Sequence, residues 1–232
     1  EVLEAFRRGI GEWVAVDANG LVRAGHPTLA MTWMDAVVDG KPVTGREGYQ
    51  VEVNALWYNA ICYTLELARK YKDKEFVAAW KDMPEKVKAS FIEKFWLDRE
   101  GYLADYVTVE GEVNKFIRPN QIIACSMDYK MLNSEQSVNV YRVVRQHLAT
   151  PKGLRTLSPR NPLYQGRIEG DQRTRDLAYH QGTVWVWLME HYVKAGFDLK
   201  GEKFLQAAED MLSDFEEDLT MSGIGSINEI YD

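Results

Sequence analysis

The sequence predicts an all-α fold of about three helix pairs, with short β-hairpins in the loops between them. Apolar residues recur at intervals of three and four along much of the chain, which is the period of an amphipathic helix. The first helices of the three pairs begin near residues 52, 120 and 178, and each follows a long polar loop. Repeated helix pairs are typical of a solenoid or a closed toroid.

The first helix pair follows a short N-terminal helix and a hairpin around an Asn-Gly turn. Residues 52–71 are predicted to form its first helix, because their apolar side chains keep the helical spacing. Residues 74–96 continue the pattern. We expect Pro84 to kink or split this second helix, because proline lacks the amide proton that a helix interior needs.

The second and third pairs are predicted from the same periodicity. Residues 120–131 and 135–150 form the second pair, and residues 177–195 and 202–219 form the third. Gly196 stands where a capping glycine is expected, so it should end the helix of residues 177–195. If the first helices lie parallel, their N-termini and the long loops open on one face. We expect a cleft on that face.

The composition is that of a globular protein. The chain has 232 residues, 46% of them hydrophobic and 27% charged, with a net charge of −7. No long run of Lys or Arg supports binding to nucleic acid or to anionic lipid. No apolar stretch approaches the roughly 20 residues of a membrane span, so no membrane association is expected. Cys62 and Cys125 lie in apolar helical patterns, which predicts buried free thiols and a reducing, cytoplasmic location.

Aromatic residues give the first indication of function. The chain contains seven Trp, twelve Tyr and eight Phe beside 35 Asp and Glu residues. Flat rings with polar edges, placed next to carboxylates, suit the binding of sugar rings. The alternative is that these large side chains simply fill the core.

Two carboxylates stand in unusual loop segments. Asp35 follows Trp33 in TWMDAVVDG, and Glu229 follows Gly225 in GSINEIYD. Hydrolysis of a glycosidic bond needs one protonated carboxyl group to donate to the leaving oxygen and one ionised group to activate water. Neither residue has a partner nearby in sequence, so the fold would have to pair them. The alternative is that both are ordinary solvated acids.

Three long segments resemble a known family. They are TWMDAVVDGKPVTGREGYQVEVNALWYNAI, LSPRNPLYQGRIEGDQRTRDLAYHQGTVWVWL and GSINEIYD. In order and across nearly the whole chain, they are similar to the C-terminal amylo-α-1,6-glucosidase domain of glycogen debranching enzymes. The resemblance implies an (α/α)6 toroid of glucoamylase type and inverting hydrolysis of α-1,6-linked glucose at glycogen branch points. It assigns the general acid to Asp35 and the general base to Glu229.

These two roles make physical demands. In an inverting enzyme the two carboxyl groups should lie roughly 6.5 to 9.5 Å apart, because a water molecule stands between the base and the sugar. The acid must stay protonated near neutral pH, which requires an apolar pocket or a nearby like charge. Trp33 and Met34 could supply the pocket, and Glu52 the like charge.

Further residues are candidates for contact with substrate. Trp33, Trp57 and Trp185 could stack on glucose, although Trp57 and Trp187 fit helical stripes and are predicted to be core residues. Candidates for hydrogen bonds to sugar hydroxyls are Arg118, Asn120, Gln121, His180 and Gln181. The alternative for Asn120 is that it caps its helix. A structural ion-pair lattice is predicted in one loop, because the charges of its side chains alternate in sign: Asp171, Arg173, Arg175 and Asp176.

No cofactor is expected. His180 has no Cys or His at ligand spacing, so a metal site is not predicted. The sequence also contains no GxGxxG, P-loop, GxSxG or CxxC motif, which leaves nucleotide cofactors and serine chemistry without support.

The length is short for a six-pair toroid, which leads to an expectation about partners. Residues 1–232 are predicted to form a partial (α/α)6 glucosidase domain, truncated at both ends. Its uncovered apolar faces would need the remainder of the polypeptide or another chain to complete the ring. Three functions stay open: a glucosidase acting on branched α-glucan, an α-glucan-binding module without catalysis, and a trehalase-like or mannosidase-like toroid hydrolase.

Overall fold

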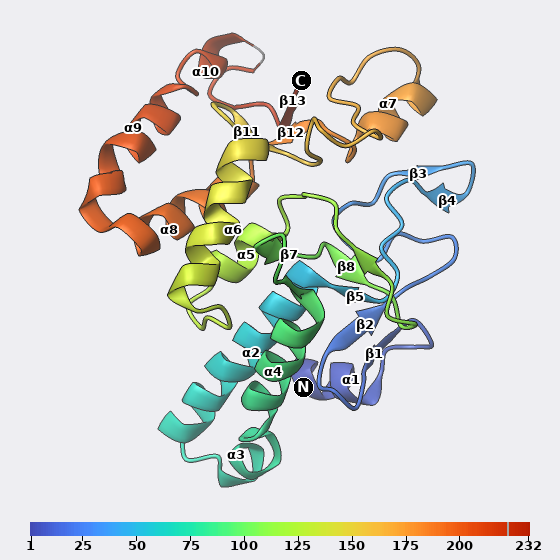
Figure 1. Ribbon diagram of the computed structural model, residues 1–232, viewed down its shortest axis with the longest axis vertical. Helices are drawn as coiled ribbons and strands as arrows, with labels where there is room; N and C mark the ends of the chain where they lie inside the picture. The colour runs from blue at the N-terminus through green and yellow to red at the C-terminus, as the bar shows by residue number, and fades with distance from the viewer. Residues whose placement is uncertain (222) are drawn as a thin grey trace.

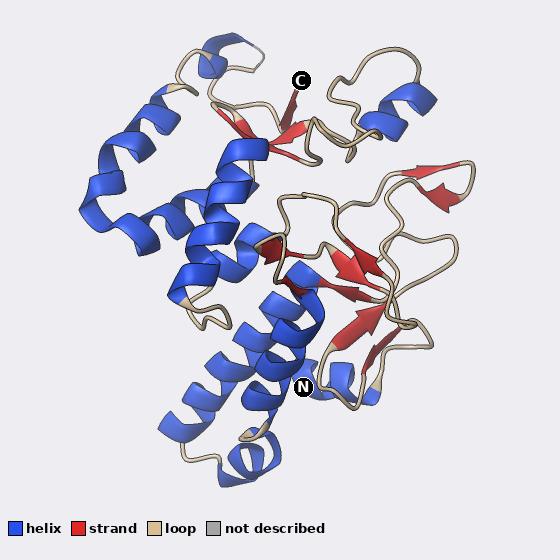
Figure 2. Ribbon diagram, viewed as in Figure 1, coloured by secondary structure: helices blue, strands red, loops and turns tan. Residues whose placement is uncertain are grey.

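Helices dominate the left and lower parts of the computed structural model, and short strands lie in the middle and on the right (Figure 1, Figure 2). The structure describes residues 1–221 and 223–232. With 45% helix and 14% strand, the chain is mostly helical, so the all-α prediction was too simple. The helices are α1 Val2–Arg8, α2 Val51–Lys70, α3 Lys74–Trp80, α4 Met83–Phe95, α5 Gln121–Ser126, α6 Ser134–His147, α7 Gln172–Ala178, α8 Leu188–Lys200, α9 Leu205–Ser213 and α10 Asp218–Met221, with a 3-10 turn η1 at Gly201–Phe204.

The strands form small antiparallel sheets in the loops between helices. A four-stranded sheet has the order β10-β11-β12-β13, a three-stranded sheet has the order β5-β8-β9, and β1-β2, β3-β4 and β6-β7 are hairpins. Their bounds are β1 Val14–Val16, β2 Val22–Ala24, β3 Val37–Val38, β4 Lys41–Pro42, β5 Tyr49–Gln50, β6 Trp96–Leu97, β7 Tyr102–Leu103, β8 Tyr106–Val107, β9 Val113–Asn114, β10 Ala149–Thr150, β11 Gly153–Arg155, β12 Val184–Trp185 and β13 Ile230–Tyr231. The β1–β2 pair confirms the hairpin predicted around the Asn-Gly turn.

The first helix pair forms as predicted. α2 packs against both α3 and α4, and Pro84 lies in the first turn of α4, so the second helix is split there. Proline is favourable at this position because the first amides of a helix have no intrahelical acceptor. The side chain of Asp73 accepts a hydrogen bond from the Phe76 amide at 3.0 Å and starts α3. Trp57 and Trp80 are buried between these helices, which confirms Trp57 as a core residue.

The first helix of the second pair is shorter than predicted. α5 ends at Ser126, because Met127 is extended and no longer continues the helix. The chain then turns into α6, where the side chain of Asn133 and that of Gln136 form a reciprocal capping box. All residues of α5 are buried, and α5 contacts α2, α6 and α8. This short helix is therefore at the centre of the helical core.

The helix predicted over residues 177–195 is wrong. The chain leaves α7 after Ala178 and passes through β12 before α8 begins. Gly182 has a φ of 152°, a conformation that residues with a side chain rarely adopt, and a Cβ there would lie 2.7 Å from the Gln165 carbonyl oxygen, so the backbone at this point is closely packed and requires glycine. An apolar run that is buried in a sheet has no periodicity to distinguish it from a buried helix, which explains the error.

The predicted end of that helix is also wrong. Gly196 lies inside α8, where a Cβ would come within 2.5 Å of the Phe204 ring. Its function is close packing, and the helix is capped by Gly201 with a φ of 58°. The helix predicted over residues 202–219 is divided into η1, α9 and α10.

Cys62 and Cys125 are free thiols, as the sequence predicts, but only Cys125 is buried and Cys62 is half-buried, so the prediction of two buried thiols was wrong for Cys62. Burial raises the pKa of the Cys125 thiol to about 12. Among the described residues, no helix is long and apolar enough to cross a bilayer.

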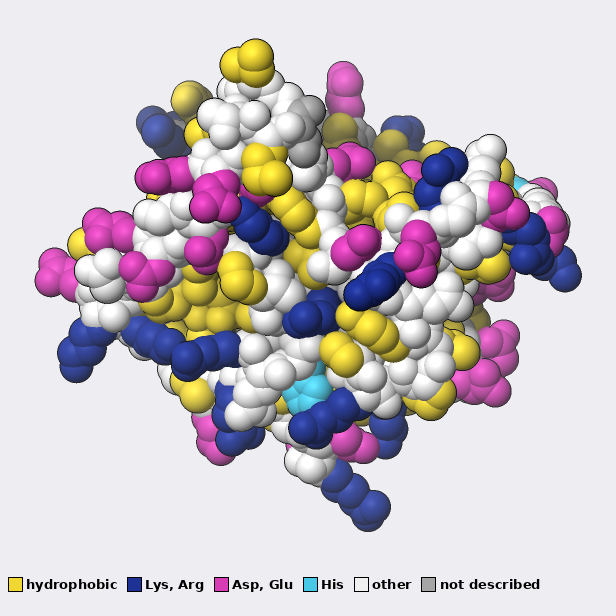
Figure 3. All heavy atoms as spheres, turned by 90° about the horizontal axis from the view of Figure 1, so that it is seen from above, with side chains coloured by type: hydrophobic (Ala, Val, Ile, Leu, Met, Phe, Trp, Pro, Cys, Tyr) yellow, Lys and Arg dark blue, Asp and Glu magenta, His cyan; other side chains and the backbone are white. Residues whose placement is uncertain are grey.

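An apolar groove of about 490 Å³ lies between α8 and α9. It contributes to the yellow surface on the left of Figure 3. Its lining includes Met189, Val193, Phe197, Met211, Leu212 and Phe215. Leu212 is 72% exposed, although it is a large apolar side chain. An apolar hollow of this size on a surface is typical of a contact region.

We expect residues 1–232, produced alone, to associate in solution, because the α8–α9 groove exposes apolar surface. Sedimentation velocity over a range of concentrations measures this. Leu212→Glu should reduce the association, whereas Leu163→Glu, which changes an exposed leucine outside the groove, should not. A compact monomer at every concentration would contradict the prediction.

Candidate active site

Tyr179 contacts one of the two carboxylates that the sequence singled out and lies within the electrostatic influence of the other. Its hydroxyl donates a hydrogen bond to Oε2 of Glu229 at 3.3 Å. The pKa of Tyr179 is raised, first by burial and then by the negative charges of Glu229 and Asp35. Both carboxylates are exposed. The charges of Asp35 and Glu229 therefore both act on one phenol, although the two residues are far apart in sequence.

Two tertiary contacts produce this arrangement. β13 pairs with β12, with Ile230 opposite Trp185, and this holds Glu229 beside the segment that follows α7. On the other side, Arg173 of α7 forms an ion pair with Asp39 at 2.9 Å. Asp39 belongs to the turn between β3 and β4, so α7 also holds the loop that carries Asp35.

Aromatic side chains form one wall of this region. Trp33 is half-buried, and its ring meets those of Trp187, His180 and Trp185 edge to face, at centroid distances of 4.9, 5.3 and 5.5 Å. Trp185 is only 7% exposed and its ring stacks on His180, which leaves little of it open to a ligand. Trp187 is 40% exposed, so the prediction that it is a core residue was wrong. It comes just before α8, outside the helical stripe that the sequence suggested.

Asn120 fixes the orientation of the Trp33 ring. Its Oδ1 accepts a hydrogen bond from the indole Nε1 of Trp33 at 2.8 Å, and its Nδ2 donates to Oδ1 of Asp105 at 2.8 Å. The side chain makes no capping hydrogen bond at α5. The alternative that Asn120 only caps its helix is therefore wrong.

Four buried charged groups lie next to Asn120 and form a continuous network. Arg46 donates from Nη2 to Oε2 of Glu52 at 2.7 Å and from Nε to Oδ2 of Asp105 at 2.8 Å. Nε of Arg118 lies 3.6 Å from the same Asp105 oxygen. No side chain of the four is more than 4% exposed. Two positive and two negative charges thus balance each other away from water.

The network changes the expectation for Glu52. Burial acts to lower the pKa of Arg46, but the charges of Asp105 and Glu52 raise it above its usual value. Arg46 therefore stays charged and neutralises Glu52. The proposed role of Glu52 as a like charge near the acid is not supported. Arg46 and Asp105 were missed because Asp105 is distant from both Arg46 and Glu52 in sequence and no local pattern connects them.

Three polar side chains hold the backbone around the candidate site in place: Arg118, Gln121 and Gln181. Arg118 donates from Nη1 to the carbonyl oxygens of Thr156 and His180, at 2.9 and 2.8 Å, and from Nη2 to Oε1 of Gln181 at 2.8 Å. Burial lowers the pKa of Arg118 to about 10. Gln121 accepts from the Leu103 amide at 3.3 Å and donates to the Arg118 carbonyl at 3.1 Å.

His180 is a fully buried, uncharged imidazole. Its ring lies 5.0 Å from that of Trp185 in a stacked arrangement, and within residues 1–221 and 223–232 neither ring nitrogen has a hydrogen-bond partner. Burial, and to a lesser extent the charge of Arg118, lowers its pKa to about 3. Over the same described residues, no group of three His, Cys, Asp or Glu side chains is arranged to hold a metal ion.

The predicted ion-pair lattice of residues 171–176 does not form. Asp171 instead caps α7 by accepting a hydrogen bond from the Thr174 amide at 2.8 Å. Arg173 pairs with Asp39, outside its own segment. Within the part of the chain that the structure describes, no ion pair joins Asp171, Arg173, Arg175 and Asp176 to one another.

Arg46→Met should lower the free energy of unfolding by about 3–5 kcal/mol, because it leaves Glu52 and Asp105 as uncompensated buried charges. Urea denaturation followed by circular dichroism measures the change. The matched control is Arg173→Met, which removes an exposed ion pair and should have a much smaller effect. Equal losses in the two variants would contradict a structural role for the network.

The low pKa of His180 predicts a pH-dependent stability. Between its unfolded value of 6.5 and the folded value of about 3, the unfolded chain binds a proton that the folded chain does not. The free energy of unfolding therefore falls as pH drops through this window, by up to about 1.4 kcal/mol per pH unit. His180→Phe should show a shallower pH dependence than wild type. Identical slopes in the two proteins would exclude this contribution.

Comparison with known proteins gives a consistent result. The sequence model of the amylo-alpha-1,6-glucosidase family matches residues 1–232. The glycogen debranching enzyme of Saccharomyces cerevisiae is 25% identical, over 81% of this chain and 15% of the yeast protein. The chain thus spans a small part of that relative.

Solved structures show a similar fold. A GH63 mannosylglycerate hydrolase from Thermus thermophilus, in complex with glucose, matches with a TM-score of 0.58 and 15% identity, over 79% of this chain and 39% of that one. A structure described as a sialidase matches all of this chain and 20% of its own length, with a TM-score of 0.69 and 12% identity. The fold accordingly matches part of toroid glycosidase structures. The chain belongs to the amylo-alpha-1,6-glucosidase family of glycoside hydrolase domains.

Proposed function

We propose that this domain releases glucose from α-1,6 branch points of glycogen or a related α-glucan by inverting hydrolysis. The observation that carries the proposal is the position of Tyr179, which binds Glu229 and lies within the electrostatic influence of Asp35, beside the tryptophan wall. Two carboxyl groups on opposite sides of a bound sugar are what glycoside hydrolysis requires. The family assignment supports the same reaction.

Asp35 is the proposed general acid. It follows Met34, which is fully buried, and lies in the loop of the half-buried Trp33. Asp35 itself is exposed, so a bound sugar has to displace the water around it. This desolvation favours the protonated form that donates to the leaving oxygen.

Glu229 is the proposed general base. The hydroxyl of Tyr179 binds one carboxylate oxygen and orients the group, which leaves the other oxygen for a water molecule. An inverting mechanism requires a separation between the two carboxyl groups that accommodates the attacking water.

The aromatic wall is the proposed place of the glucose ring. Trp33 and Trp187 are the tryptophans of the cluster that retain accessible surface, so they are the stacking residues. The remaining predicted binding residues support them: Asn120 orients Trp33, and Arg118, Gln121 and Gln181 position the segment of His180. The fully buried ring of His180 packs against Trp33 and Trp185 and helps to hold the wall.

Asp35→Asn and Glu229→Gln should each lower glucose release from phosphorylase limit dextrin by at least about 10²-fold, because each removes a proton-transfer group. The assay uses the natural polypeptide that contains this domain. Glu85→Gln is the control, since it changes an exposed acid of α4, outside the candidate site, and should leave the rate near that of wild type. NMR of the first product should show β-glucose, the inverted anomer.

Wild-type release by both variants would remove the catalytic assignment. Binding of glycogen by wild type without any release would instead favour a glucan-binding module. The similarity to a mannosylglycerate hydrolase supports a second candidate, a toroid hydrolase with another substrate. Trehalose, mannosylglycerate and maltose assayed in parallel distinguish the two, because a branch-point enzyme should prefer the limit dextrin.

A further inference from the structure

A second hollow lies between the β1–β2 hairpin and the loop before β5. Its lining includes Glu12, Trp13, Arg23, His26 and Glu47, and its volume is about 210 Å³. This is below the roughly 300–1,000 Å³ of sites for drug-sized ligands, so it suits a single small ring. We propose that this hollow is an outer subsite for an α-1,4-linked glucan chain. The inference rests on the proposed function, because the chain it holds is that of the same glucan substrate.

Trp13 provides a stacking surface in the hollow. Its side chain is 40% exposed, and its backbone is held because its carbonyl oxygen accepts a hydrogen bond from the Gly25 amide at 3.1 Å. The His26 ring lies 4.2 Å from the indole at an angle of 58° and limits its movement. An exposed indole in a fixed orientation can bind the apolar face of a pyranose at little cost in side-chain entropy.

The rim of the hollow carries both donors and acceptors. Glu12 and Glu47 are exposed, and in the part of the chain described by the structure neither forms an ion pair. Arg23 is partly exposed and donates from Nε to Asp17 at 3.1 Å. Two carboxylates beside the hollow disfavour a phosphate or another anion. Sugar hydroxyls, which both donate and accept, fit this mixture.

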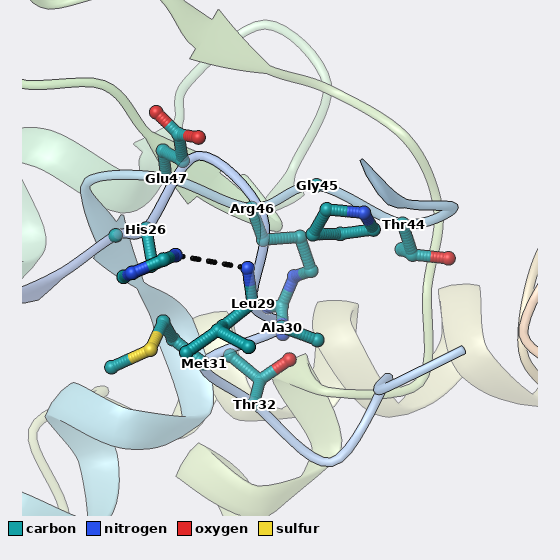
Figure 4. Close-up of a pocket in the computed structure, with 11 residues that line it drawn as sticks. His26, Leu29, Ala30, Met31, Thr32, Thr44, Gly45, Arg46 and Glu47 are labelled. Atoms are coloured by element: carbon teal, nitrogen blue, oxygen red, sulfur yellow. Dashed lines mark hydrogen bonds between the residues drawn. The ribbon is translucent and has the colours of Figure 1, made fainter. Parts of the chain in front are cut away.

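The contacts of His26 give it a defined polarity. Its Nδ1 accepts hydrogen bonds from the backbone amides of Thr28 and Leu29, at 3.1 and 3.0 Å, and the bond to Leu29 is drawn in Figure 4. The neutral ring must therefore carry its proton on Nε2. That leaves one N–H donor for a hydroxyl beside the Trp13 ring.

The loop that carries His26 also leads to the candidate active site. It continues through Thr32 to Trp33, and Ala24 is tied to Gly48 by backbone hydrogen bonds of 2.8 and 2.9 Å. The pocket of Figure 4, lined by Thr32 and Arg46 among others, has room for about 10 Å³ and can hold a water molecule at most. A glucan would thus cross the outer surface of this loop.

The test measures the affinity of the natural polypeptide for glycogen and for maltoheptaose, in a Glu229→Gln background that prevents turnover. Trp13→Ala should raise the dissociation constant for glycogen about 5- to 10-fold, and Trp13→Phe should recover part of the loss. The control is Tyr71→Ala, which removes an aromatic ring that is 74% exposed but lies outside the hollow. It should bind as the background protein does.

The inference is overturned if Trp13→Ala binds both glucans as tightly as the background protein, or if that protein binds neither. Its failure is distinct from failure of the proposed function. If wild type releases glucose but Trp13→Ala does not weaken glucan binding, only the outer subsite is contradicted. If Trp13→Ala weakens glucan binding but wild type releases no glucose, only the catalytic proposal is contradicted.

Discussion

The buried network of Arg46, Glu52, Asp105 and Arg118 is the constraint on which the candidate site depends. Removing four charges from water is costly, and the cost is offset only when each group keeps its partner. The network therefore specifies the relative positions of the segments that contribute to it: the loop before β5, the first turn of α2, the residue before β8 and the approach to α5. Asn120 connects it to Trp33, so the position of the aromatic wall follows from the position of the charges.

The sequence was informative where local physics decides the structure. The helical spacing of α2 and the proline at the start of α4 could be interpreted from neighbouring residues alone. The failure over residues 177–195 has the opposite cause. There, a close backbone approach at Gly182 and pairing with β11 and β13 override the apolar pattern, and none of these partners is adjacent in sequence.

In the candidate site, too, local motifs could be recognised from the sequence, but contacts between distant residues could not. The motifs identified Asp35, Trp33 and Glu229, but not what surrounds them. Arg46 and Asp105 are 59 positions apart, and Trp33 and Asn120 are 87 apart, so no local pattern could connect them. Trp187 was misplaced because a helix was expected where a strand leads into α8. Tyr179 was overlooked since a single tyrosine in a loop has no distinctive spacing.

The neutrality of Tyr179 has a consequence for the chemistry. Its raised pKa keeps the phenol protonated, so it binds Glu229 and meets the field of Asp35 without carrying a positive charge. A lysine or arginine in its place would stabilise the ionised form of both carboxyl groups and draw them toward itself. Under the roles proposed for Asp35 and Glu229, the domain would then have two bases and no proton donor. A neutral phenol at this position avoids that outcome.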